Sequence, residues 1–224
     1  MIDRIEENYS TESLMAVSVL VIGGLTLMNS FLLIGDGVDV SLDSETAEIS
    51  YEDIMPEGEP EVYGPTLAVA YDDVSQTDPV STEETINEMA EIDRDISHEE
   101  LSEDEVQRYV SIAGSISCEY CCDVPAIIFE NGEPACGCEH SYAMRGLAKY
   151  LITEHEDEFS DEEILEELGK WKTRFFPDQH LEKAQIMKEE GLETDFISLT
   201  SNEYRGIEQQ AQTGGNGGGM VGAC

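Results

Sequence analysis

The chain has 224 residues and a formal net charge of −39, which comes from 50 acidic and 11 basic side chains. A surface this negative repels nucleic acids and anionic membrane surfaces, so we exclude DNA and RNA as partners. The charge also destabilises a compact state unless salt screens it. Such an excess of acidic over basic residues is typical of proteins from salt-loving microbes. The alternative explanation of the charge is an acidic linker within an ordinary protein.

An apolar segment near the N-terminus predicts a membrane anchor. Residues 13–35 contain no charged side chain, and about 20 apolar residues are enough to span a bilayer. The run is longer than that of a signal peptide, and no small-residue cleavage site is evident. We therefore expect a short tail at 1–13 and a single transmembrane helix at 14–35 in the cell membrane. Arg4 is the one basic residue near either end, so the positive-inside rule places the bulk of the chain outside the cytoplasm.

Three further parts are expected after the anchor. Residues 36–61 are acidic and lack apolar periodicity, which predicts a disordered spacer. Residues 62–190 carry the periodic apolar pattern of a folded, mainly helical domain. Residues 191–224 are polar and then rich in glycine, which predicts a flexible tail.

Two helices of the domain are predicted by their first residues. Ser102 with Glu105, and Ser160 with Glu163, have the spacing of a capping box. Apolar residues follow each box at helical spacing. They are Val106, Tyr109, Val110 and Ala113 in the first helix, and Ile164, Leu168, Trp171 and Phe175 in the second. The same reasoning predicts helices at about 142–153 and 179–190.

Residues 126–138 predict a small β-hairpin. The dipeptide Asn131-Gly132 suits a two-residue turn, and short apolar segments flank it. Pairing outward from this turn sets Glu130 opposite Glu133 and Ala126 opposite Gly137. The residues on either side of the hairpin would then meet, and those residues are rich in cysteine.

The candidate site is a cluster of five cysteines and one histidine with the spacing C-x2-C-C-x13-C-x-C-x-H. Thiolate and imidazole are the ligands that soft and borderline metals prefer. The hairpin would bring both ends of the cluster together as one metal site for zinc or copper. Its candidate ligands are Cys118, Cys121, Cys122, Cys136, Cys138 and His140.

The spacing alone leaves the ligand set and the metal open. A closed zinc site needs four ligands, and Cys118, Cys121, Cys136 and Cys138 are the obvious four. Surplus thiols at close spacing suit copper(I) instead. His140 is either a ligand or a surface or capping residue.

Structural disulfides and thiol redox chemistry are the two alternatives to a metal site. With Cys224 the cysteines make an even six, which would suit disulfides in an exported domain. The adjacent pair Cys121 and Cys122 and the C-x-C spacing argue against this. A thiol-disulfide redox protein is the second alternative, although a thioredoxin-type C-x-x-C begins a helix after a strand, whereas Cys118 follows a helix.

No catalytic residue is identified. His98, His155 and His180 lie in acidic or polar contexts and are expected at the surface. Arg145 either balances the charge of the thiolates or forms an ordinary salt bridge. A metalloenzyme would need an open coordination position and a nearby base, and no candidate base is evident.

The cysteine region resembles known families. In its order of cysteines, Asn-Gly turn and Ser-capped helix, the stretch from about 115 to 172 resembles the PCYCGC-motif lipoproteins of bacterial surfaces, but without their Pro-Cys-Tyr-Cys-Gly-Cys run or lipobox. The run CGC-x-HS-x-A-x-RGLAKYL, from Cys136 to Leu151, is similar to that of uncharacterised archaeal single-pass membrane proteins. Both resemblances imply an extracytoplasmic metal-binding protein.

The sequence thus predicts an anchored, mainly helical protein with a cysteine-rich hairpin that holds zinc or copper. The metal would either lock the fold or pass to a protein partner.

Overall fold

The structure is a computed structural model that describes residues 48–208. Within this range it is mainly helical, as predicted, and contains no β-strand. The α-helices are α2 (Tyr51–Ile54), α3 (Gly64–Leu67), α4 (Pro79–Asp95), α5 (Glu103–Ala113), α6 (Glu139–Glu154), α7 (Asp161–Phe175), α8 (Pro177–Glu189) and α9 (Phe196–Thr200). Three 3-10 turns accompany them: η1 (Tyr71–Asp73) before α4, η2 (His98–Glu100) before α5, and η3 (Asn202–Tyr204) after α9.

The expected tail at 1–13 and anchor at 14–35 lie outside the described residues. Between residues 48 and 208, no helix is both long and apolar enough to cross a membrane.

The predicted capping boxes begin α5 and α7. The Glu105 amide donates to Ser102 Oγ at 3.3 Å, and the Ser102 amide donates to the Glu105 carboxylate at 2.7 Å. Ser160 and Glu163 repeat this exchange at 3.3 and 2.8 Å. Each pair satisfies amides that the first turn of a helix leaves without a partner.

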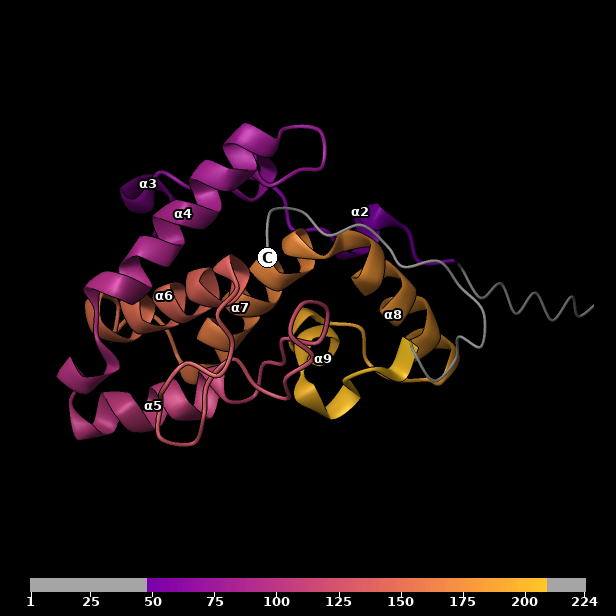
Figure 1. Cartoon of the computed structure of the whole chain (residues 1–224). Coiled ribbons are helices and arrows are strands. Elements are labelled where there is room, and N and C mark those ends of the chain that lie inside the picture. The colour runs from indigo at the N-terminus through magenta and orange to yellow at the C-terminus, as the bar shows by residue number, and fades with distance from the viewer. Residues whose placement is uncertain (1–47, 209–224) are drawn as a thin grey trace, which may run out of the picture. The chain divides into compact units, whose positions relative to one another are not determined.

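The main core forms around α6, which packs against α4, α5 and α7 (Figure 1). The predicted stripe of α7 is fully buried: Ile164, Leu168, Trp171 and Phe175 each have 0% of their surface exposed. Gly146 lies where α6 crosses α4, and a Cβ atom there would be 2.1 Å from the Met89 carbonyl oxygen. The close approach of these two helices therefore requires a glycine.

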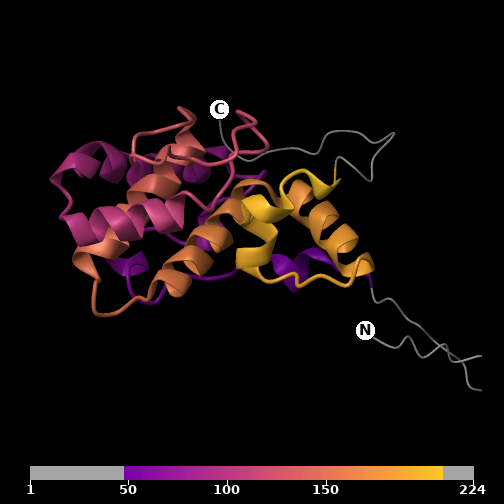
Figure 2. The same cartoon turned by 90° about the horizontal axis from the view of Figure 1, so that it is seen from below.

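The folded unit extends beyond the predicted limits of 62–190. Ile49 and Ile54, within the segment expected to be a disordered spacer, pack with Met187 of α8 in a second small core. The indigo segment that contains α2 lies beside α8 (Figure 2). Leu199 of α9, within the expected flexible tail, joins the same core. These few apolar residues order segments whose composition is otherwise polar, because they bury their side chains against α8.

The predicted hairpin is reduced to a turn and a single bridge. The Phe129 amide donates to the Glu133 carbonyl at 2.8 Å, and the Gly132 amide donates to the Phe129 carbonyl at 2.9 Å. Gly132 has φ +85°, which closes a three-residue turn rather than the predicted two-residue turn. The register shifts by one residue as a result, so that Ile128 lies opposite Pro134. Pro134 has no amide hydrogen to donate, but the Ala135 amide donates to the Ile127 carbonyl at 3.0 Å, so the pairing extends one residue beyond it.

Candidate metal site

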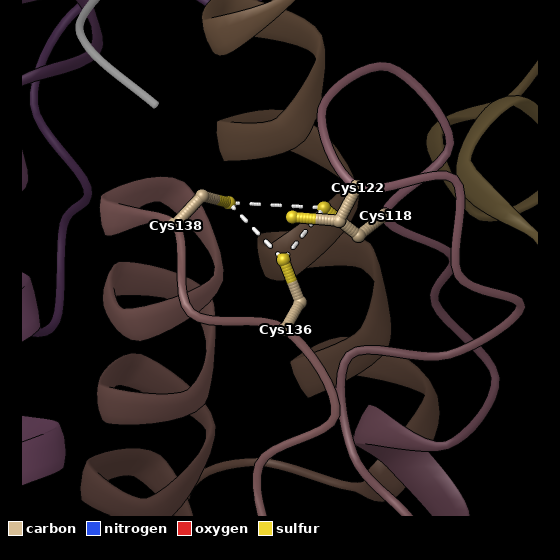
Figure 3. A group of neighbouring side chains, drawn as sticks. All are labelled: Cys118, Cys122, Cys136 and Cys138. Atoms are coloured by element: carbon tan, nitrogen blue, oxygen red, sulfur yellow. Dashed lines mark hydrogen bonds between the residues drawn. The ribbon is translucent and has the colours of Figure 1, made fainter.

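Four cysteines from two segments place their sulfur atoms together (Figure 3). Cys118 and Cys122 belong to the loop after α5, whereas Cys136 and Cys138 precede α6. All four sulfur atoms lie within 4.8 Å of one another. The Cys118 sulfur lies 3.2 Å from that of Cys136 and 3.7 Å from that of Cys138, and the sulfur atoms of Cys136 and Cys138 are 3.5 Å apart.

These distances approach the geometry of a tetrathiolate metal site. Zinc–sulfur bonds of about 2.3 Å in a tetrahedron imply sulfur–sulfur edges of about 3.8 Å. A disulfide bond would instead bring two sulfur atoms to about 2.05 Å. Cys118, Cys122, Cys136 and Cys138 are free thiols, so structural disulfides among these four are not formed. The group can hold a metal ion.

The second cysteine pair is fixed by the first turn of α6. Cys138 is the N-cap residue, and its sulfur accepts from the Ser141 amide at 3.4 Å. The Ser141 hydroxyl lies 3.4 Å from the same sulfur. Arg145, one turn further along α6, donates to the Cys136 carbonyl at 2.8 Å and forms a buried ion pair with Asp93 at 3.0 Å. Arg145 thus forms the ordinary salt bridge that the sequence left open, and also holds the C-x-C segment.

The first cysteine pair is fixed by a short loop and a buried ion pair. Cys118 and Val124 exchange backbone hydrogen bonds of 3.1 and 3.3 Å, which close the loop that contains Cys122. Lys172 of α7 donates to the residues on both sides of Cys118, to Ser117 Oγ at 3.1 Å and to Glu119 Oε1 at 3.0 Å. Cys118 therefore cannot move without disturbing a buried charge pair.

Hydrogen bonds among the thiols stabilise one negative charge within the group. Hydrogen bonding from Cys138 lowers the pKa of Cys118 to about 4, despite burial. Hydrogen bonding to Cys136, followed by burial, raises the pKa of Cys122 to about 12. The hydrogen bond with Cys118 also raises the pKa of Cys138. One thiolate stabilised by neighbouring thiols is the expected state, and binding of a metal to all four sulfurs would release the remaining protons.

The other two predicted ligands form a second group with Cys138. The Cys121 sulfur lies 3.8 Å from His140 Nδ1, and both atoms lie within 4.8 Å of the Cys138 sulfur. The His140 ring is fully buried between Phe175 and Phe176, at 4.9 Å from each ring centroid. All six predicted residues are therefore brought together, in two groups that share Cys138.

The four-sulfur group differs from the set that the spacing favoured. The C-x2-C pattern pointed to Cys121, but the structure places Cys122 with the other three cysteines. Cys121 is disulfide-bonded, and Cys122 lies in the loop that the Cys118–Val124 bridge closes. A loop of this kind is not visible in cysteine spacing.

A buried polar network beside the site was not predicted from the sequence. Glu119 accepts from Lys172 and, at 3.1 Å, from Lys183, and all three side chains are buried. Burial alone would raise the pKa of Glu119, but the two lysines lower it to about 2. The prediction that His180 lies at the surface is wrong, because it is 0% exposed. The sequence did contain a pattern that indicates burial. The spacing along α8 is that of an inward helix face for His180, Lys183, Ala184 and Met187.

Comparison of the chain with protein-family models, with curated proteins and with solved structures finds no match.

Proposed function

We propose that this protein binds one metal ion, zinc in the first place, through the thiolates of Cys118, Cys122, Cys136 and Cys138. The observation that carries this proposal is the convergence of four free thiols, from two segments, to within 4.8 Å of one another. A tetrahedral set of four sulfurs is the environment that zinc and iron–sulfur centres prefer. Copper(I), which also selects sulfur, is the alternative ion. Elemental analysis distinguishes zinc, copper and iron.

A thiol-disulfide redox protein is supported less well by the same cluster. The low pKa of Cys118 is a feature of reactive cysteines. However, Cys118 is only 4% exposed, and a redox cysteine must reach its substrate. The exposed thiol is that of Cys122, and its pKa is raised to about 12. The nucleophilic thiol is therefore buried and the accessible one is protonated, which argues against disulfide exchange.

We further propose that the protein is anchored in the cell membrane with its metal site outside the cytoplasm. The support is the uncharged segment 13–35, the position of Arg4 and the resemblance of residues 115–172 to surface proteins. In this setting the site either stabilises the domain or passes the ion to a protein partner. Membrane fractionation, with labelling of intact cells by an impermeant thiol reagent after metal removal, tests both the anchor and its orientation.

Titration of the reduced full-length protein with cobalt(II) tests the ligand set. Cobalt in a tetrathiolate site gives a thiolate-to-metal charge-transfer band that zinc displaces, and we expect saturation at one cobalt per chain. The variant Cys122→Ser should lose the four-sulfur spectrum. If Cys121→Ser loses it and Cys122→Ser keeps it, the ligand set proposed here is wrong. If no charge-transfer band forms, the metal site itself is wrong.

A further inference from the structure

The four cysteines differ in their access to solvent. Cys118, Cys136 and Cys138 have 4%, 4% and 5% of their surface exposed, whereas Cys122 is exposed. In Figure 3 the sulfur atoms of the three buried residues are joined by hydrogen bonds. A metal ion held by all four would thus have three shielded bonds and one bond at the surface.

The backbone around the exposed cysteine is also held differently. Cys118 and Cys138 are fixed by backbone and helix-cap hydrogen bonds, as described above. Cys122 instead lies inside the loop that the Cys118–Val124 bridge closes, next to Asp123. Asp123 has φ +53°, a conformation that costs a non-glycine residue of order 1 kcal/mol or more. This loop can relieve local strain by moving, whereas the other three ligands cannot move without breaking buried contacts.

A contact at the surface holds this strained residue in place. Arg205, after η3, donates to the Asp123 carbonyl at 2.9 Å and forms an ion pair with its carboxylate. The two side chains keep 32% and 78% of their surface exposed. Arg205 therefore restrains Asp123 through contacts that are accessible from solvent.

We propose that Cys122 is the ligand through which the metal is exchanged with a thiol-bearing partner, and that Arg205 is the positioning residue that restrains this exchange. An incoming thiolate forms a bond to the ion on its exposed side while the bond from the ion to the Cys122 sulfur breaks. The released Cys122 thiolate takes a proton from water, and the oxidation state of the ion does not change. This inference rests on the proposed function and deepens it, because it makes the site one for metal transfer.

The first test uses the native full-length chain loaded with zinc ions. Limited alkylation by iodoacetamide, followed by peptide mass spectrometry, should modify Cys122 first, and loss of zinc should follow that modification at the same rate. Earlier modification of Cys118, Cys136 or Cys138, or modification of all four together, would overturn the exchange role. If added zinc protects no cysteine, the proposed metal site fails as well, so the two failures are distinguishable.

The second test measures the rate of zinc transfer to a chromogenic chelator. Arg205→Gln should accelerate transfer about fivefold while zinc still binds at one per chain, because an exposed ion pair contributes up to about 1 kcal/mol. Arg108→Gln is the matched control, since Arg108 forms an ion pair of similar exposure with Asp161 at 2.6 Å, away from the loop. Equal rates in Arg205→Gln and the native protein would contradict the proposal that Arg205 restrains the exchange.

Discussion

Lys172 of α7 donates to Glu119 at 3.0 Å, and the exposed fractions of the two side chains are 1% and 0%. Glu119 directly follows Cys118 in the chain, so a charge pair in the interior fixes one wall of the metal site. Lys183 of α8 also donates to Glu119, at 3.1 Å. Two helices are thereby tied to the same residue of the cysteine loop.

Removing the Lys172 charge should destabilise the fold. The variant Lys172→Met leaves the buried Glu119 with one lysine in place of two, and we expect the free energy of unfolding to fall by about 3 kcal/mol. The control is Lys170→Met, which removes partly exposed pairs with Glu166 and Glu167 at 2.9 and 2.7 Å and should cost less than about 1 kcal/mol. Urea unfolding measures both, and equal losses would show that the buried pair has no special role.

Much of the helical framework is predictable from local sequence. The capping boxes at Ser102 and Ser160 occur as expected, and the stripe from Ile164 to Phe175 is buried along its length. These features depend on neighbours within one or two helical turns. They can be recognised without knowing what the helix packs against.

The charged interior was not predictable in the same way. Lys172, Lys183 and Glu119 lie in separate segments of the chain, and their burial depends on partners that are 53 and 64 residues apart in sequence. The choice of Cys122 over Cys121 depends on the loop that the Cys118–Val124 bridge closes, which a cysteine pattern does not reveal. The dipeptide Asn131-Gly132 correctly predicted a turn, but not its length. The turn has three residues, and this shifts the pairing on either side by one residue.

The crossing of α4 and α6 should be sensitive to a single methyl group. Gly146→Ala places a Cβ 2.1 Å from the Met89 carbonyl oxygen, so we expect a loss of more than about 2 kcal/mol. Replacing a helical glycine by alanine usually stabilises a protein by roughly 0.5–1 kcal/mol. A loss of stability would therefore indicate the steric clash with α4. Gly137→Ala is the control, because a Cβ there meets nothing within 4 Å. Thermal unfolding of both variants measures the difference, and a stabilised Gly146→Ala protein would contradict the helix crossing.

Stability should fall in acid partly because of His180. Burial, and then the charges of Lys172 and Lys183, lower the pKa of His180 from 6.5 to about 3. Between these values the unfolded chain binds a proton that the native chain does not, so stability decreases as pH falls through this window. The contribution is about 1.4 kcal/mol for each pH unit.

The variant His180→Asn isolates this effect. Its amide can replace the Nδ1 group, which lies 2.8 Å from the Phe176 carbonyl oxygen, and it does not titrate. The stability advantage of the native protein over the variant should therefore shrink as the pH is lowered from 6.5 towards 3. Chemical unfolding at a series of pH values measures it. An advantage that stays constant or grows would show that His180 takes up a proton readily in the folded state.

Salt should stabilise the protein because of its net charge of −39. Repulsion between surface carboxylates weakens as the Debye length falls from about 10 Å at 0.1 M to about 3 Å at 1 M salt. We expect the midpoint of thermal unfolding to rise over this range of sodium chloride. Sucrose at matched osmolality controls for general exclusion from the surface. An effect of sucrose as large as that of the salt would rule out charge screening as the cause.

The central claim is that Cys118, Cys122, Cys136 and Cys138 hold a metal ion. The most direct test is native mass spectrometry of the full-length protein, purified without chelator, together with elemental analysis of the same sample. We expect one zinc per chain, and four thiols that become reactive when the metal is removed. A metal-free chain would contradict this claim, whether the four cysteines react freely from the start or are joined in disulfides.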